Sequence, residues 1–145
     1  MHDFKPGEEK LERFWVSQAA LIIRDNKILI LKNASIDEWF FPGGRADLGE
    51  RGDEALGREL KEEINVDCYK KIAVIDYDLW YTPHRAIPVC SIANLIDIGD
   101  AGIKLSNEHT EFSWITEPEI DKYKFAWPKA KDFIKKAFEL KKIYE

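Results

Sequence analysis

The stretch Gly43–Val66, GGRADLGERGDEALGRELKEEINV, carries the most informative pattern in the chain. Its second half has apolar residues at every fourth position, a spacing that predicts one buried face of a helix over residues 52–64. The apolar positions are Leu56, Leu60 and Ile64. Asn65 follows, and asparagine readily adopts the left-handed conformation that ends a helix. The stretch therefore predicts a loop that begins at Pro42-Gly43-Gly44 and leads into an amphipathic helix.

An acidic face lies beside the apolar face of this predicted helix. Glu59, Glu62 and Glu63 project from it within a single turn. Like charges at this spacing repel one another, so a positive partner should offset them. The nearby Arg58 cannot neutralise all of these acids, whereas a divalent cation such as Mg²⁺ or Mn²⁺ can. A solvated helical surface is the alternative interpretation. The glycines before the helix favour a ligand site, because they let the backbone come close to a ligand.

The flanking sequence predicts strands. Phe14–Arg24 and Ile28–Leu31 read as two strands joined by a tight turn at Asp25-Asn26-Lys27, and Trp39–Phe41 follows. Three further strands are expected at residues 71–81, 87–98 and 112–116, with an exposed connection at residues 82–86. Pro128 suits the first turn of a terminal helix. Strands interrupted by one helix and closed by another predict an α/β (α+β) fold, a sheet with helices packed on it.

Composition narrows the class of protein. The chain has 145 residues and a net charge of −5, with 45% hydrophobic residues, and it shows no internal repeat or linker. We therefore expect a single domain over residues 1–145, with a loose arm at residues 1–10. The negative charge argues against binding of a nucleic-acid duplex. Cys68 and Cys90 are too few for a disulfide framework, and no segment is long and apolar enough for a bilayer. We expect a soluble, cytoplasmic protein that does not bind membranes.

The stretch Gly44–Val66 resembles the Nudix box, G-x5-E-x7-R-E-U-x-E-E-x-G-U, in which U is aliphatic. The matching positions are Gly44, Glu50, Arg58, Glu59, Leu60, Glu62, Glu63 and Val66. Asn65 stands where the pattern has glycine, a mild change because asparagine also enters the left-handed region. The resemblance implies the Nudix fold, a mixed β-sheet sandwiched between helices. It also implies Mg²⁺-dependent hydrolysis of a nucleoside diphosphate linked to another moiety, with Mn²⁺ as a substitute.

The resemblance also assigns roles to residues. It implies that Glu59, Glu62 and Glu63 ligate the metal, together with a backbone carbonyl for which Gly44 is our candidate. Arg58 is expected to tie the helix to the preceding loop, in preference to a contact with substrate phosphate. Glu50 is expected to assist through metal-bound water or to hold that loop.

The general base remains open at this point. Within the family this task falls to a box glutamate, here Glu59 or Glu62, or to a residue of a later loop. The later segment offers Glu108, His109 and Glu111. A histidine has a pKa suited to proton transfer, although a surface histidine is more often inert. Glu111 fits equally well as a charge at a sheet edge.

Substrate-binding residues are predicted outside the box. Trp39, Phe40 and Trp80 are aromatic side chains near predicted strand ends where a nucleobase could stack, and Arg85 could meet ribose or phosphate. Each of them fits core or sheet surface as well. We expect a nucleoside triphosphate or a nucleotide sugar such as ADP-ribose as the substrate. The alternatives are a sugar-nucleotide glycosyl hydrolase and a non-catalytic nucleotide sensor. Exposed strand edges also leave a homodimer open.

Overall fold

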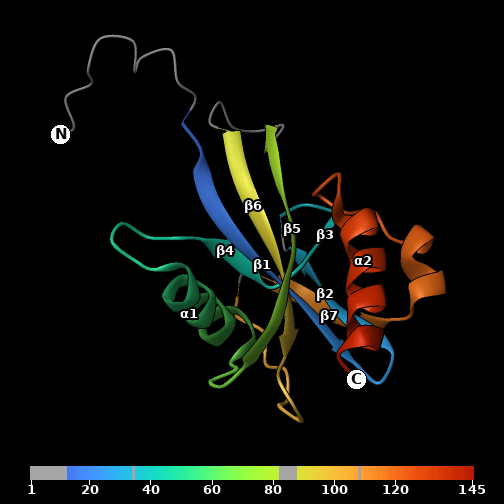
Figure 1. Cartoon of the computed structure of the whole chain (residues 1–145). Helices are drawn as coiled ribbons and strands as arrows, with labels where there is room; N and C mark the ends of the chain where they lie inside the picture. The colour runs from blue at the N-terminus through green and yellow to red at the C-terminus, as the bar shows by residue number, and fades with distance from the viewer. Residues whose placement is uncertain (1–12, 34, 82–87, 108) are drawn as a thin grey trace, which may run out of the picture.

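A twisted sheet lies between two helices in the computed structural model (Figure 1), which describes residues 13–33, 35–81, 88–107 and 109–145. Helix α1 covers one face of the sheet and helix α2 covers the other. The helices are α1 (Gly52–Ile64) and α2 (Ala130–Ile143), with a 3-10 helix, η2, at Glu117–Lys122. This mixed sheet between helices is the α+β architecture that the sequence predicts.

Strand β1 (Trp15–Arg24) joins the two halves of the sheet. It pairs in parallel with β6 along most of its length, and in antiparallel fashion with β4 and, through a tight turn, with β2. The remaining pairs are β5 with β6, and β3 and β7 with β2. The bounds are β2 Lys27–Asn33, β3 Trp39–Phe40, β4 Gly43–Arg45, β5 Lys70–Tyr81, β6 Pro88–Asp97 and β7 His109–Ile115.

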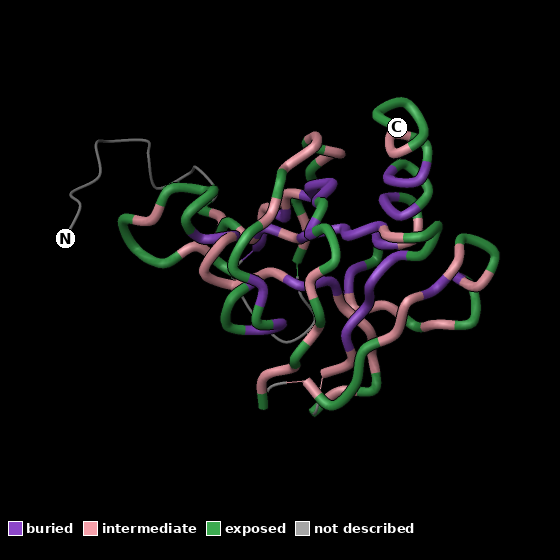
Figure 2. Tube along the Cα trace, turned by 90° about the horizontal axis from the view of Figure 1, so that it is seen from below, coloured by how far each residue is buried: buried purple, intermediate pink, exposed green. Residues whose placement is uncertain are grey.

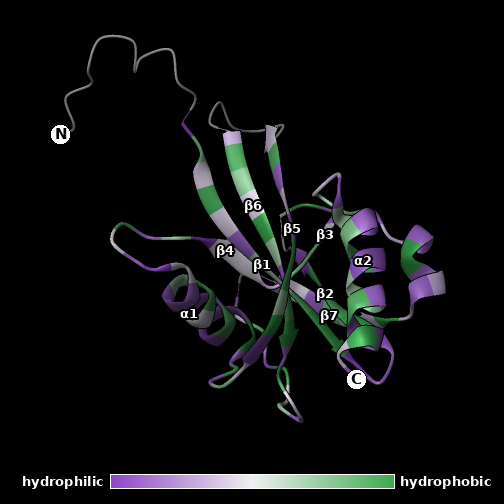
Figure 3. Cartoon of the chain, in the orientation of Figure 1, coloured by the Kyte–Doolittle hydropathy of each residue, from purple (hydrophilic) through white to green (hydrophobic). Residues whose placement is uncertain are grey.

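Two apolar cores hold the layers together, one on each face of the sheet. Leu56, Leu60 and Ile64 of α1 are fully buried against one face, as their spacing predicts. Phe133 and Ile134 of α2 pack on the opposite face. Buried residues lie in the interior of the molecule (Figure 2), and apolar residues lie along the strands of the sheet and on α2 (Figure 3). Within the described residues, neither helix has the length and hydropathy needed to cross a bilayer.

Helix α1 ends as the sequence predicts. Asn65 has φ 58° and ψ 39°, in the left-handed region, and its backbone N–H and that of Val66 donate to the carbonyls of Lys61 and Leu60. The backbone N–H groups of Lys104 and Ser106 then donate to carbonyls of the last helical turn. The C-terminal end of α1 is therefore fixed against the segment that leads to β7.

The expected loop at Pro42-Gly43-Gly44 is wrong, because Gly43–Arg45 forms strand β4 on β1. Gly43 has φ 142°, and a Cβ atom there would lie 2.0 Å from the carbonyl oxygen of Gln18. Only glycine permits this close pairing. The loop begins after Arg45 instead.

Two element starts and one additional element differ from the sequence-based expectation. Strand β7 begins at His109 rather than Phe112, so His109 lies in a strand and not in a loop. Helix α2 begins at Ala130, and Pro128 lies in the turn before it. The 3-10 helix η2 was not predicted. The expected exposed connection at residues 82–86 lies outside the described residues.

Replacing Gly43 with alanine should destabilise the fold by about 3 kcal/mol or more, because the new methyl group would overlap the Gln18 carbonyl. Chemical denaturation measures the change. The control is Gly102→Ala, since nothing lies within 4 Å of a Cβ at Gly102. We expect the control to change stability by roughly 0.5 kcal/mol or less. Equal effects of the two substitutions would contradict the close pairing.

Candidate functional site

Arg58 organises the acidic end of the Gly43–Val66 stretch. Its guanidinium donates to both carboxylate oxygens of Glu50, with Nε to Oε2 at 2.7 Å and Nη2 to Oε1 at 3.0 Å. Nη2 also donates to the backbone carbonyl of Arg45 at 3.0 Å. The fork geometry of arginine allows these bonds to form together. Arg58 therefore joins α1 to β4 and to the loop that connects them.

The same guanidinium reaches two further acids of the helix. Its Nη1 donates to Glu59 Oε1 at 3.0 Å and to Glu62 Oε2 at 3.1 Å. Glu63 points elsewhere, because its Oε2 accepts a hydrogen bond from the backbone N–H of Gly43 at 2.9 Å. The carboxylates of Glu59, Glu62 and Glu63 thus all lie at the junction between α1 and β4.

The pKa values of two of these glutamates are shifted in opposite directions, that of Glu59 upward and that of Glu50 downward. The pKa of Glu59 is raised to about 7, mainly because burial disfavours the charged form and next because Glu63 repels it. The pKa of Glu50 is lowered, because Arg58 and the backbone N–H of Asp47 donate to its charged form. The hydrogen bond to Glu50 raises the pKa of Arg58 above its usual value. Arg58 therefore offsets only part of the repulsion among the acids.

Gly44 brings the backbone of β4 against the acids. A Cβ atom at Gly44 would lie 2.6 Å from the carboxylate carbon of Glu59, so any other residue would displace that carboxylate from its present position. Side chains alternate along β4 and β1. Gly44 and Gln18 accordingly face α1, while Arg45 and Ser17 face the other side of the sheet.

The chemistry of the donors fits Mg²⁺ or Mn²⁺. Hard carboxylate oxygens suit these ions, and a cation would relieve the repulsion by Glu63 that adds to burial in raising the pKa of Glu59. Among the residues that the structure describes, no group of three or more acidic, histidine or cysteine side chains is arranged to hold a metal ion by itself. Mg²⁺ typically takes only one or two protein carboxylates and keeps water as its other ligands. The junction therefore suits an open metal site rather than a closed one.

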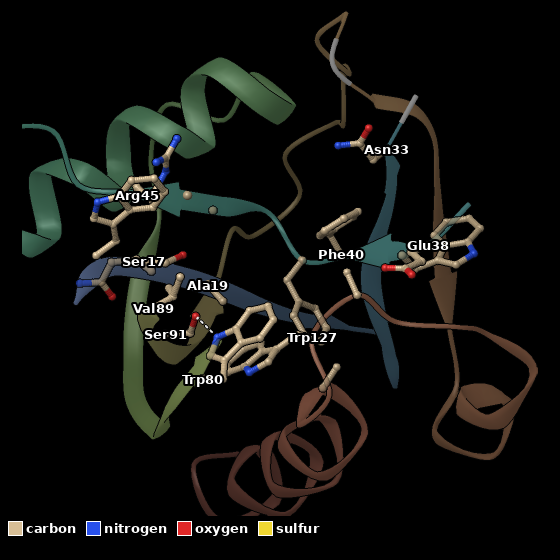
Figure 4. Close-up of a pocket in the computed structure, with 18 of the residues that line it drawn as sticks. Ser17, Ala19, Asn33, Glu38, Phe40, Arg45, Trp80, Val89, Ser91 and Trp127 are labelled. Carbon is tan, nitrogen blue, oxygen red and sulfur yellow. Dashed lines mark hydrogen bonds between the residues drawn. The ribbon is translucent and has the colours of Figure 1, made fainter. Parts of the chain in front are cut away.

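An aromatic cleft of about 510 Å³ lies next to this junction, on the opposite side of β4 (Figure 4). Gly43 and Gly44 line its edge, so the cleft and the acids share one short strand. The aromatic lining consists of Trp15, Trp39, Phe40, Phe41, Trp80 and Trp127. A cleft with aromatic walls and few polar groups is typical of a site for a flat organic ligand.

Two of the indoles are fixed in the cleft wall by hydrogen bonds. Trp80 Nε1 donates to Ser91 Oγ at 2.9 Å, which Figure 4 shows as a dashed line, and Trp127 Nε1 donates to Asp78 Oδ2 at 3.0 Å. Their N–H groups are therefore engaged within the protein. These rings offer the cleft their apolar surfaces rather than hydrogen-bond donors.

The predicted site residues fall into three places. Glu50, Arg58, Glu59, Glu62, Glu63 and Gly44 gather at the junction of α1 and β4, and Trp39, Phe40 and Trp80 line the cleft. Glu111 lies on β7, where its Oε1 is 3.5 Å from Lys32 Nζ. His109 also lies on β7, and its nearly buried ring is next to Glu63, with Nε2 3.7 Å from Glu63 Oε1. Glu108 and Arg85 lie outside the described residues.

Sequence reasoning missed Trp15, Arg45 and Trp127 as lining residues of the cleft. Trp15 alternates with Ser17 and Ala19 along β1, a period-2 signal that could have placed it on the cleft side. Arg45 is opposite Ser17 in β4, and the mistaken loop at Gly43 hid that register. Trp127 comes from the turn before α2, for which no sequence periodicity exists.

A comparison with protein families identifies the chain. The model of the NUDIX domain matches residues 13–137, which is most of the chain. The protein belongs to the NUDIX domain family. The NUDIX box that the sequence suggested is thus part of a match that extends from β1 to α2.

Curated relatives resemble parts of this NUDIX domain. An RNA pyrophosphohydrolase of Campylobacter jejuni subsp. doylei is 47% identical over 55 residues, which are 37% of this chain and 34% of the relative. An RNA pyrophosphohydrolase of Ruthia magnifica is 29% identical over 85 residues, 51% of this chain and 47% of the relative. The matches therefore span about a third to a half of the length of these relatives.

Solved structures share the NUDIX fold across most of the chain. A UDP-X diphosphatase has a TM-score of 0.76 at 14% identity and covers 99% of this chain and 74% of its own. A NUDIX hydrolase from Nitrosomonas europaea has a TM-score of 0.75 at 19% identity, with coverages of 88% and 90%. At these identities the likeness shows the fold alone.

Replacing Arg58 with alanine should destabilise the protein by about 1 to 3 kcal/mol, because the partly buried Glu59 and its neighbour Glu50 would lose their charged donor. Arg58→Lys should recover only part of this loss, since an ammonium cannot reproduce the fork. Thermal and chemical unfolding measure both. Lys71→Ala is the control, because it removes only the more exposed pair with Asp53 and should cost roughly 1 kcal/mol at most. Equal losses in Arg58→Ala and Lys71→Ala would contradict the role of Arg58.

Glu59→Gln should stabilise the protein at alkaline pH. A carboxyl group whose pKa is higher in the folded state stabilises most when it is protonated, and this contribution declines as the pH rises from its usual pKa of 4.5 to the folded value of about 7. In EDTA, the unfolding free energy of Glu59→Gln relative to the unmodified protein should rise between pH 5 and pH 8, by about 1 to 2 kcal/mol after solvent screening. Glu54→Gln should show no such rise. A flat difference for Glu59→Gln would contradict the raised pKa.

Proposed function

We propose that this NUDIX domain hydrolyses the pyrophosphate linkage of a nucleoside diphosphate joined to another moiety, with Mg²⁺ or Mn²⁺ as cofactor. One observation carries the proposal: the carboxylates of Glu59, Glu62 and Glu63 gather at the strand that also forms the edge of the aromatic cleft. A ligand with a flat ring at one end and phosphates at the other can reach both places at once.

The cleft binds and orients the substrate in this proposal. Trp39, Phe40 and Trp80 supply apolar aromatic surface on which a base can stack, and the cleft is large enough for a nucleoside. Trp39 itself is held edge-on against Tyr123, with ring centroids 5.2 Å apart. A wall whose rings are already fixed binds a planar group at a lower cost in side-chain entropy.

Glu59, Glu62 and Glu63 are the side chains that we propose to hold the metal, together with the carbonyl of Gly44. A divalent cation bound there would screen the phosphate oxygens, orient the leaving phosphate and acidify the attacking water. Arg58 holds Glu59 and Glu62 through one nitrogen, and Gly43 holds Glu63 through its backbone N–H. These bonds engage one oxygen of Glu59 and one of Glu62 and leave the other for a ligand, whereas Oε1 of Glu63 lies 3.7 Å from His109 Nε2.

We propose that a box glutamate, Glu59 or Glu62, accepts the proton of the attacking water. Glu111 is next to Lys32, and His109 is turned toward Glu63. Both β7 side chains therefore have partners elsewhere, whereas Glu59 and Glu62 lie on α1 next to β4, each with one carboxylate oxygen bonded to Arg58. We propose for His109 a role in holding Glu63.

The substrate class rests on the comparisons as well as on the cleft. The curated relatives are named RNA pyrophosphohydrolase, and structural neighbours include a UDP-X diphosphatase and an Ap4A hydrolase of Caenorhabditis elegans. All of these names describe phosphate anhydrides of nucleotides. We propose a nucleoside triphosphate or a nucleotide sugar such as ADP-ribose as the substrate in the cytoplasm. A test panel should therefore combine these with Ap4A and 5′-triphosphorylated RNA.

Glu62→Gln and Glu63→Gln should each lower metal-dependent turnover by at least about a hundredfold, because each removes a ligand charge from the proposed metal site. The fold should stay intact, since glutamine keeps an oxygen that can accept the bonds from Arg58 or Gly43. Turnover is measured on the panel with Mg²⁺, with pyrophosphate, monophosphate and free sugar identified as products.

Glu54→Gln is the matched control for this experiment. Glu54 lies on the same helix, but its carboxylate accepts from the backbone N–H of Arg51 at the first turn. It should keep turnover within about twofold of the unmodified protein, as expected for an exposed substitution away from the site. Full activity in both Glu62→Gln and Glu63→Gln would overturn the metal-ligand assignment. Release of free sugar alone would favour glycosyl hydrolysis, and binding without turnover would favour a sensor.

A further inference from the structure

The cleft has opposite charges at its two sides. Among the described residues that line it, Arg45 is the only cation and Glu38 is the only acid. Figure 4 shows Arg45 on β4 at one side of the cleft, with Glu38 and Phe40 at the other. Glu38 also has Lys124 nearby, with Oε1 and Nζ 3.5 Å apart. An anionic group that enters the cleft is therefore favoured on the side of Arg45, the only cation of the described lining, whereas Lys124 already faces the acid on the other side.

The guanidinium of Arg45 is held in a defined position. Its central carbon lies 4.1 Å from the centroid of the Trp15 ring, a cation–π contact. Its backbone is fixed independently, because β4 pairs with β1 and the Arg45 carbonyl accepts a hydrogen bond from Arg58. A guanidinium that lies over an indole can still donate N–H groups to an anion, because the cation–π contact uses none of them as a hydrogen-bond donor.

Arg45 also stands on the strand that has the acids on one side and the cleft on the other. It follows Gly44, whose backbone lies against the Glu59 carboxylate, and its own side chain projects to the cleft side of the same strand. A ligand that joins a ring in the cleft to phosphates at α1 has to pass along β4.

We propose that Arg45, stacked on Trp15, is a substrate-binding residue that takes the phosphate attached to the nucleoside, with the base directed toward Trp80, Trp127 and Glu38. This assignment rests on the proposed function in one respect, the nucleotide nature of the ligand. It adds a defined orientation: the nucleoside monophosphate half occupies the cleft and the remainder of the substrate extends toward α1. A guanidinium suits this task because it binds phosphate through paired N–H groups.

Binding in EDTA tests the proposal without metal or turnover. The probes are AMP, GMP, CMP and UMP, each compared with its own nucleoside, by calorimetry or tryptophan fluorescence. At least one monophosphate should bind about tenfold or more tightly than its nucleoside, as expected for a charged hydrogen bond. Arg45→Gln should reduce this ratio to about one and leave the affinity for the nucleoside unchanged, whereas Arg45→Lys should keep part of it.

Arg24→Gln is the matched control. Arg24 is also stacked on an indole, that of Trp114 at 4.5 Å, but it lies at the far end of β1 and donates to the carbonyls of Gly99 and Ala101. Its substitution should leave the ratio of monophosphate to nucleoside affinity unchanged. An unchanged ratio in Arg45→Gln, or an equal loss in both variants, would overturn the proposal. So would a protein in which no monophosphate binds more tightly than its nucleoside.

Steady-state kinetics provide a second readout. On the best substrate of the panel, Arg45→Gln should raise KM by about tenfold or more and change kcat by about threefold at most, because the contact exists in both ground and transition states. A fall in kcat at constant KM would contradict a binding role. If the unmodified protein hydrolyses nothing in the panel, the proposed function fails, and the EDTA binding ratio still decides the role of Arg45.

Discussion

The close approach of β4 to helix α1 is the constraint on which the rest of the structure depends. Gly43 and Gly44 carry no side chains where the Gln18 carbonyl and the Glu59 carboxylate leave no room for a Cβ atom. The backbone of β4 can therefore lie against β1, and its N–H at Gly43 can hold Glu63. The short strand β4, with its two glycines, thus separates a cluster of carboxylates from an aromatic cleft. The two halves of the site depend on this separation.

The arrangement of the acids on α1 lowers the stability of the folded protein. Burial and the repulsion by Glu63 raise the pKa of Glu59, so the ionised carboxylate disfavours the fold. Arg58 offsets part of this cost, and by bonding to Glu50 and the Arg45 carbonyl it also fixes the loop before α1. Such a conflict between local stability and charge is expected where a site is built for a ligand. In this account, the cation that relieves the repulsion is the cofactor.

Much of this arrangement could be predicted from the sequence. The spacing of Leu56, Leu60 and Ile64 predicts helix α1 and its buried face, and Asn65 predicts where the helix ends. These features follow from local periodicity and backbone preference. The match to the Nudix box singled out Glu59 and Arg58 as site residues, and in the structure the two side chains are hydrogen-bonded.

The remainder depends on contacts between distant segments, which no local pattern contains. Strand β4 was mistaken for a loop, because glycine normally breaks strands and here serves the close pairing with Gln18. Trp127 reaches the cleft from the turn before α2, and its indole is fixed by Asp78, which is 49 residues away in sequence. The orientation of Glu63 toward Gly43 likewise follows from the packing of α1 on the sheet. The sequence therefore identified the acids and three aromatic residues of the cleft, but not the contacts that bring Trp15, Arg45 and Trp127 to it.

A crystal structure with Mg²⁺ and a non-hydrolysable nucleotide analogue tests the central claim most directly. The account predicts density for an ion at about 2.0 to 2.2 Å from carboxylate oxygens of Glu59, Glu62 or Glu63, with the diphosphate bridge beside it and the base in the aromatic cleft. A nucleotide bound with its phosphates away from α1, or an analogue in place without an ion at these carboxylates, would contradict it.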